Sequence, residues 1–161
     1  MIVVSDTSPL VALNHLRLLD LLAELFDEVL VPPAVKAELG AGSTVWQPLD
    51  LAGYVFVRVQ APQNAQRTAE LAQVLDPGES EAVALAVELG ATILIDEAEG
   101  RRVASRLGLR VTGTIAILLE AKRVGRLDSV KTAIDRLRSE LRFFISRQLR
   151  QDALRLAAES E

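Results

Sequence analysis

Acidic side chains stand where an α/β sheet usually builds its binding sites. Asp6 directly follows the apolar-rich run Ile2–Ser5, and Asp96 stands at the end of the run Thr92–Ile95. Short runs of this kind are typical of buried strands. Open α/β sheets bind their ligands beyond the carboxyl ends of the strands. The sequence therefore predicts two carboxylates at one edge of a sheet.

Two further segments offer carboxylates to the same edge. Glu38 lies near the end of a short predicted helix over 34–39. Glu79 and Glu81 lie in the first turn of a predicted helix over 79–89, after an Asp-Pro-Gly turn signal. Four segments that are far apart in the sequence thus supply acids that could converge.

Converging carboxylates limit the chemistry to a few classes. Acids that crowd together away from water need protons or cations to offset their charge. Oxygen ligands, with no cysteine and one histidine in the chain, indicate Mg²⁺ or Mn²⁺. The natural use of such a site is phosphodiester hydrolysis, in which the ion activates water and offsets charge on the phosphate.

Each acid also has a plain structural interpretation. Glu79 and Glu81 could simply favour the positive end of a helix dipole. Glu38 could be an exposed helix acid, and Asp96 could only start the next helix. Asp6 is the hardest to explain in this way, because a charged residue directly after a buried apolar run is unusual unless it is paired or bound.

The sequence gives little support for other kinds of functional site. His15 is the single histidine and lies among leucines, so we interpret it as a helix residue rather than a catalyst, and no Ser-His-Asp triad is identifiable. The sequence has neither a GxxxxGK[ST] nor a GxGxxG motif. Trp46 and Tyr54 are isolated, so no aromatic stacking platform is predicted.

Charge is distributed unevenly along the chain. The net charge is −4, but residues 1–100 hold 4 basic and 15 acidic side chains, a balance of −11. Residues 101–161 hold 14 basic and 7 acidic side chains, a balance of +7. Such asymmetry indicates contact with nucleic acid, and Arg101 and Arg102 could touch phosphate. A solvated helix face explains the same arginines equally well.

Apolar runs and helical patterns alternate along the chain. This order predicts an α/β protein with a mostly parallel sheet covered on both faces. Ser8 is predicted to cap the first helix, with Pro9 at its first position. Strands are expected over 2–5, 28–31, 54–59, 92–95 and 109–111. Helices are expected over 10–26, as one helix or two, and over 34–39, 63–74, 79–89, 99–107, 129–137 and 146–158. A further helix is expected to begin at Thr112 or Gly113 and to end at Val124.

Length and composition favour one folded domain over 1–161, with a helical C-terminal part from about residue 128. The chain has 161 residues, half of them apolar, which is enough for a core without disulfides. We see no signal peptide and no membrane-length apolar segment. A soluble cytoplasmic protein is therefore expected.

Four motifs resemble those of PIN domains, in the same order. Their segments are Ser5-Asp6-Thr7-Ser8-Pro9-Leu10, the run from Val31 to Leu39, the run from Leu75 to Ala86, and Ile93-Leu94-Ile95-Asp96-Glu97. Downstream, Arg101-Arg102-Val103-Ala104 and the run Gly113–Leu119 resemble a PIN-like subfamily, related to VapC-like toxins, that is described as predicted nucleic-acid binding. The resemblance covers nearly the whole chain.

The resemblance implies a three-layer α/β/α sandwich and a Mg²⁺- or Mn²⁺-dependent ribonuclease. It also implies frequent homodimers and, for toxin members, an antitoxin protein as partner. Its acidic positions match Asp6, Glu38, Glu79 and Asp96.

Two of these positions stay open. Glu81 could replace Glu79 as a metal ligand, and Glu97 could replace Asp96. Thr7 or Ser8 would assist the water at the metal. The third acid, commonly Asp in the family, is Glu here, so the alternative is a weakly active or inactive PIN-like module that binds nucleic acid or protein.

Overall fold

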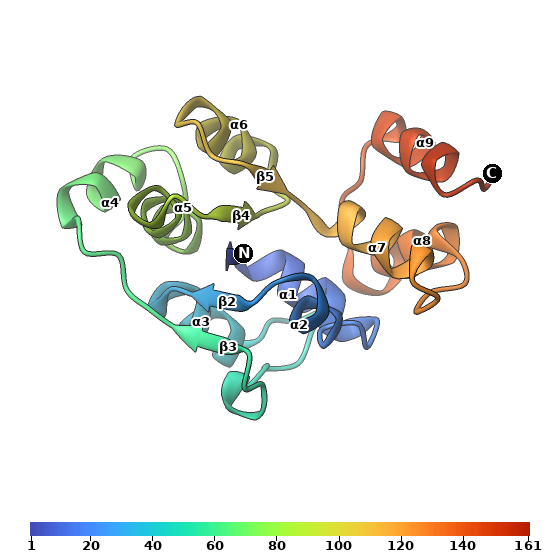
Figure 1. The fold of residues 1–161 in the computed structure, drawn as a ribbon, viewed down its shortest axis with the longest axis horizontal. Helices are drawn as coiled ribbons and strands as arrows, with labels where there is room; N and C mark the ends of the chain where they lie inside the picture. The colour runs from blue at the N-terminus through green and yellow to red at the C-terminus, as the bar shows by residue number, and fades with distance from the viewer.

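A computed structural model describes residues 1–161. Its centre is one parallel sheet, drawn edge to edge in Figure 1 from β3 to β5. The strands in spatial order are β3 (Val57–Val59), β2 (Glu28–Val31), β1 (Ile2–Ser5), β4 (Thr92–Leu94) and β5 (Val111–Thr112). Because β1 and β4 are neighbours, with Ser5 opposite Leu94, the residues that follow them share one edge. The predicted parallel sheet is confirmed.

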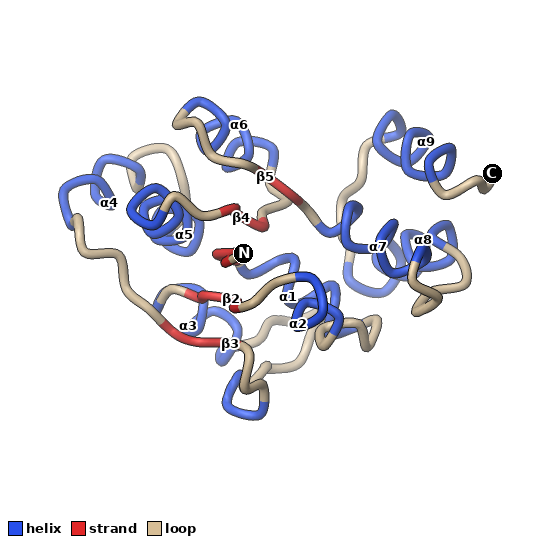
Figure 2. The backbone as a smooth tube through the Cα atoms, viewed as in Figure 1, coloured by secondary structure: helices blue, strands red, loops and turns tan.

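Helices separate the strands and enclose the sheet, as the tube in Figure 2 shows. They are α1 (Thr7–His15), α2 (Leu21–Leu25), α3 (Pro33–Ala41), α4 (Ala65–Leu71), α5 (Pro77–Leu89), α6 (Ala98–Arg106), α7 (Thr114–Arg123), α8 (Val130–Leu141) and α9 (Arg147–Leu156). A short 3₁₀ turn spans Leu51–Gly53. No helix combines the length and the apolar character needed to cross a membrane.

The two faces of the sheet bury two separate apolar clusters. Val3, on one face of β1, belongs to a cluster of 27 buried residues that includes side chains of α1, α2, α3, α7, α8 and α9. Val4, on the other face, belongs to a cluster of 13 with α4, α5 and α6. Successive strand residues point to opposite faces, so apolar runs without alternation are what a sheet covered on both sides requires. The result is the three-layer α/β/α sandwich.

Three strands are shorter than predicted: β4 by its last residue, and β3 and β5 for local reasons. The β3 strand is shorter than 54–59 because the Tyr54 N–H donates to Leu51 O, 3.0 Å away, and closes the 3₁₀ turn. The β5 strand begins later than residue 109 because the Leu109 N–H donates to Ala104 O, 3.1 Å away, and belongs to the end of α6.

One helix start and one helix end differ from the prediction, and one helix end agrees with it. Asp6, not Ser8, is the N-cap residue of α1, because the Asp6 N–H still donates to Leu94 O in the sheet and the helix begins directly afterwards. The third helix passes through Gly40 and ends at Gly42, which has a left-handed φ of 67°. Gly90, with φ 62°, ends α5 as predicted.

The C-terminal helices lie against the same side of the sheet as α1. Val130, Ile134 and Leu137 of α8 and Ala153 of α9 are buried in the larger cluster. The eighth helix continues past residue 137 to Leu141 and stops at Arg142, which has a left-handed φ of 56°. In Figure 1, α9 and the C-terminus lie at the side of the molecule away from α4.

Candidate functional site

Asp6 occupies the centre of the carboxyl edge. It caps α1 at the end of β1, and only 5% of its surface is exposed. Burial raises the pKa of Asp6 to about 8, although the backbone N–H of Thr7 opposes this. Three acids add to the rise through their negative charge: Glu79, Asp76 and Glu38. Asp6 therefore strongly favours a proton or another cation beside it.

Glu79 sits in the first turn of α5 and is held by a capping box. Its Oε1 accepts from the Asp76 N–H at 3.1 Å, and the Glu79 N–H donates to Asp76 Oδ1 at 2.8 Å. The other oxygen, Oε2, is buried and has no hydrogen-bond partner. Burial raises the pKa of Glu79 to about 7, and the charges of Asp76 and Glu97 add to the rise. An unpartnered carboxylate oxygen in this setting is costly unless a cation or proton meets it.

Glu38 approaches from α3, the helix that packs between α1 and α5. Thr7 fixes it there, since Thr7 Oγ1 donates to Glu38 Oε2 at 2.6 Å. The sequence predicted Thr7 only as a helper of the water at the metal. Its hydroxyl instead orients one of the carboxylates, which is a positioning role.

Asp96 forms a second group beside the first. Thr114, the first residue of α7, donates to it twice: from its N–H to Oδ1 at 2.8 Å and from its hydroxyl to Oδ2 at 2.6 Å. Burial raises the pKa of Asp96, while these two bonds and the charge of Arg101 lower it. Arg101 is anchored by a 2.7 Å bond from Nη1 to Ile95 O. Asp96 thus has donors that Glu79 Oε2 lacks.

Three glycines from three segments lie against the site carboxylates, which occupy the space that a side chain would need. At Gly78 and Gly113 an added Cβ atom would collide with a carboxylate oxygen, whereas at Gly100 it would collide with Ile95 Cδ1, 2.5 Å away, and lie close to a carboxylate oxygen. The contacts are Gly78 to Glu38 Oε1 at 2.6 Å, Gly100 to Glu79 Oε2 at 3.0 Å, and Gly113 to Asp96 Oδ1 at 2.8 Å. The backbone itself therefore forms the walls around these acids.

The remaining predicted residues lie at the margin. Glu81 Oε1 accepts from the Ala34 N–H at 3.0 Å, so Glu81 serves the first turn of α3. Glu79 is the acid whose charge raises the pKa of Asp6 most. Glu97 is exposed, close enough to raise the pKa of Glu79. Ser8 is exposed, and Arg102 forms an ion pair with Glu99 on the surface of α6.

The structure thus gathers Asp6, Glu38 and Glu79, with Asp96 in a neighbouring group. No three acidic or histidine side chains form a ready-made metal site. The chemistry of the donors nevertheless fits a hard divalent cation, because they are oxygen atoms only and Glu79 Oε2 is buried without a partner.

Two residues of this edge were missed from the sequence. Asp76 was interpreted only as part of a turn, although Asp76-Pro77-Gly78-Glu79 has the spacing of a capping box. Thr114 was treated as part of a helix start. Nothing in its local sequence indicates that it would reach Asp96 from 18 residues away.

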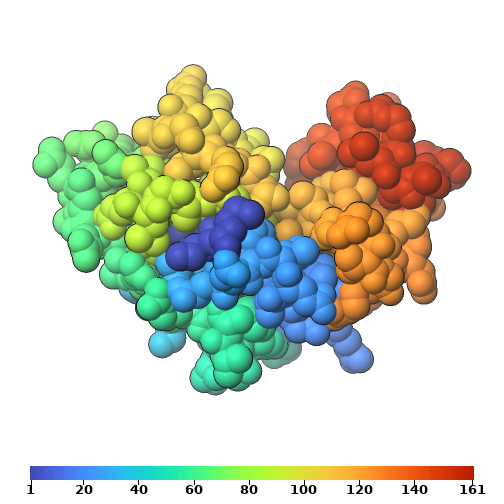
Figure 3. All heavy atoms as spheres, viewed as in Figure 1, coloured from blue at the N-terminus to red at the C-terminus, as the bar shows by residue number.

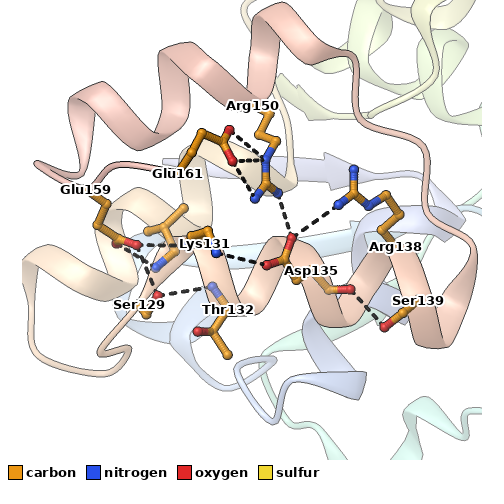
Figure 4. A network of polar contacts seen from close by, with 10 residues as sticks. Ser129, Lys131, Thr132, Asp135, Arg138, Ser139, Arg150, Glu159 and Glu161 are labelled. Carbon is orange, nitrogen blue, oxygen red and sulfur yellow. Dashed lines mark hydrogen bonds and ion pairs between the residues drawn. The ribbon is translucent and has the colours of Figure 1, made fainter.

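Most basic residues of the C-terminal half form ion pairs with acidic side chains of the same chain. Nine of the fourteen form ion pairs. Several join a network that we call the C-terminal clamp, built from Lys122, Ser129, Lys131, Asp135, Arg150, Glu159 and Glu161 and drawn in part in Figure 4. The five basic residues without an ion pair are Arg101, Arg106, Arg110, Arg142 and Arg147. His15 bonds Glu140 at 2.7 Å, away from the acids.

Comparison with known proteins supports one family. A family model described as a PIN domain matches residues 2–159. A comparison with curated proteins found no match.

Proposed function

Since the chain belongs to the PIN-domain family, whose members are generally nucleases, we propose that it is a Mg²⁺- or Mn²⁺-dependent ribonuclease that hydrolyses phosphodiester bonds of RNA. One observation carries the proposal: Glu79 Oε2 is buried and unpartnered at the edge where Asp6 lies. Buried polar atoms are nearly always hydrogen-bonded, so this oxygen is available to bind a cation.

The cation would be held by Asp6, Glu38 and Glu79, with Asp96 or Glu97 beside them. A bound divalent ion activates water and offsets the charge that develops on the phosphate. The raised pKa values of Asp6 and Glu79 support this assignment, because burial and, to a smaller extent, the neighbouring acids disfavour the bare carboxylates, and a bound cation would offset both effects.

The other residues of the edge support these acids. Thr7 orients Glu38, and Thr114 orients Asp96 through both of its donors. Arg101 has one nitrogen committed to Ile95 O and forms no ion pair, so its remaining N–H groups can meet a phosphate. Arg is well suited to such a contact because of its planar array of donors.

Cleavage of a mixed RNA pool in Mg²⁺ or Mn²⁺ tests the proposal. We expect cleavage by the wild type, loss with EDTA, and a fall of at least about 100-fold in Asp6→Asn, since even outer-shell changes at metal sites cost about 10–100-fold. Asp128→Asn is the matched control, because Asp128 is exposed and has no hydrogen bond or ion pair. Equal cleavage by Asp6→Asn and wild type would overturn the assignment.

A second pair of variants tests which glutamate acts. Glu79→Gln should lose activity, whereas Glu81→Gln should keep it, because a glutamine oxygen can still accept from the Ala34 N–H. The reverse result would assign the ligand to Glu81.

The absence of a ready-made group of three ligands favours a second candidate, a PIN-like module that binds RNA or a protein without cutting. Titration with Mn²⁺ separates the two. Saturable uptake that is lost in Asp6→Asn supports the nuclease, and no saturable uptake supports the binding module. The toxin role, the antitoxin partner, the homodimer and the cytoplasmic location stay predictions from the family resemblance and the composition.

A further inference from the structure

A pocket of about 740 Å³ lies next to the acidic edge. Thr7, Ser8, Asp96 and Glu97 line one end of it, and the chain between α8 and α9 lines the other. Figure 3 shows a notch in the surface between the gold-coloured α6 and the red α9, the two elements that contribute Arg101 and Leu149 to the pocket. Its volume lies in the range of small-ligand sites.

The chain between α8 and α9 presents one aromatic ring to this space. Arg142 turns the chain through its left-handed conformation, and the Phe143 N–H closes the turn by donating to Leu137 O at 3.1 Å. Phe143 and Ile145 then pack against the core. Phe144, between them, is 86% exposed and lines the pocket. The ring is therefore held outward by a short segment anchored on both sides.

A second aromatic side chain lines the same pocket. Trp46 comes from the loop after α3 and packs partly against the core. The sequence suggested no stacking platform because Trp46 is isolated along the chain. The fold places it around the same space as Phe144, 98 positions later.

Beside the acids Asp96 and Glu97, the pocket has two arginines that can meet a phosphate backbone. Arg101 and Arg142 both line it, and neither is in an ion pair. They are two of only five such basic residues in the C-terminal half. Aromatic rings flanked by arginines are typical of sites for single-stranded nucleic acid, where bases stack and phosphates meet the cations.

We propose that this pocket is a subsite for an unpaired nucleobase of the RNA strand, stacked on Phe144 and Trp46, with the adjoining phosphate against Arg142 or Arg101. The inference rests on the proposed function, since it names the strand that would reach the acids. It implies a single-stranded substrate, because a base must leave its stack to contact a protein ring.

The chain provides its own probe for this subsite. Trp46 is the only tryptophan, so its fluorescence should be quenched when a base stacks in the pocket. The titrant is a short 2′-O-methylated oligoribonucleotide in the presence of EDTA, which allows binding without cleavage. An abasic oligomer of the same length keeps the phosphates but offers nothing to stack.

We expect saturable quenching of the wild type by the oligoribonucleotide and none by the abasic oligomer. Phe144→Ala should bind about tenfold more weakly, which corresponds to about 1.4 kcal/mol, whereas Phe144→Tyr should bind like the wild type. Val55→Ala is the matched control, because Val55 is a fully exposed apolar side chain that does not line the pocket.

The subsite would be overturned by no quenching of the wild type, or by equal binding by Phe144→Ala and wild type. Equal quenching by the abasic oligomer would also overturn it in favour of a phosphate site. These outcomes are independent of the proposed function, because binding is measured without metal. A protein that stacks bases in this way but never cleaves RNA would keep the subsite and lose the ribonuclease.

Discussion

Two groups of carboxylates in this molecule have opposite affinities for protons. At the carboxyl edge of the sheet, burial raises the pKa of Asp6 to about 8 and that of Glu79 to about 7. In the C-terminal clamp, burial opposes the ionised form of Glu159, yet Lys122 and other donors lower its pKa to about 2. Residues of one chemical type are thus placed in two contrasting surroundings.

The difference comes from the number of donors that each carboxylate meets. Glu159 accepts from Lys122 Nζ at 2.8 Å, and three groups around the start of α8 also donate to it. These donors are Ser129 Oγ at 3.0 Å, the Val130 N–H at 2.7 Å and the Lys131 N–H at 3.0 Å. Glu79 Oε2 meets none. A carboxylate with all its partners holds the fold together, whereas a carboxylate oxygen without a partner is available to a ligand.

The strongest test of this contrast is Asp6→Asn measured for activity and stability together. Activity should fall at least about 100-fold, while the metal-free protein becomes more stable at pH 8 by up to about 5 kcal/mol, because the variant lacks the buried carboxyl whose pKa the fold raises from 3.8 to about 8. The gain should shrink as the pH falls towards 4, where Asp6 is protonated in the folded state. Urea unfolding at several pH values measures this, and a variant less stable than wild type at pH 8 would contradict it.

The free energy of unfolding of the metal-free protein should also depend on pH, with opposite slopes in two pH ranges. The folded pKa of Asp6 lies above its unfolded value of 3.8, so its contribution to stability falls as the pH rises from about 4 to 8. The folded pKa of Glu159 lies below its unfolded value of 4.5, so its contribution is lost as the pH falls from about 4.5 to 2.

Mn²⁺ should abolish the loss of stability between about pH 4 and 8, since the cation replaces the protons on the acids of the carboxyl edge. At a concentration of about 100 Kd it should stabilise the protein by about 2.7 kcal/mol at pH 8, and by less at pH 5. Thermal unfolding with and without the ion measures both. A shift of equal size at pH 5 and pH 8 would show that the ion binds away from these acids.

Loss of an acid from the C-terminal clamp should destabilise the protein, whereas Asp6→Asn should stabilise it. Glu159→Ala leaves Lys122 and the first N–H groups of α8 without their acceptor, so we expect a loss of about 2 kcal/mol with unchanged Mn²⁺ uptake. Glu161→Ala is the control, because its bond to Arg150 is more exposed and its effect should be smaller. Altered Mn²⁺ uptake in Glu159→Ala would mean that the two regions are coupled.

The smallest effects come from the glycines. A methyl group at Gly113 would lie 2.8 Å from Asp96 Oδ1 and 2.7 Å from Arg101 Nη1, so Gly113→Ala should cost about 1 kcal/mol and reduce RNA cleavage. Gly40 has no atom within 4 Å of an added Cβ, and Gly40→Ala should stabilise α3 by about 0.5–1 kcal/mol. If the two variants had equal stability and equal RNA cleavage, the glycines would have no role at the site.

The sequence allowed the strands and the acids to be predicted where local pattern decides. The β1 and β2 strands have their predicted bounds because each is a short apolar run. The partners of the acids could not be predicted, because Thr114 reaches Asp96 only through the pairing of β4 with β5. The C-terminal arginines suggested an RNA-binding face, but many pair with acids from other elements, as Arg126 does with Asp20.

The strand order has a consequence for biosynthesis. The central strand β1 has β4 as a neighbour in space, but Leu94 is made 89 residues after Ser5. At about 5–20 residues per second, one edge of β1 waits roughly 4 to 18 seconds on the ribosome for its partner. Asp6 has Asp96 beside its strand only after that interval. A nascent chain is therefore unable to complete the acidic edge until more than half of it has been translated.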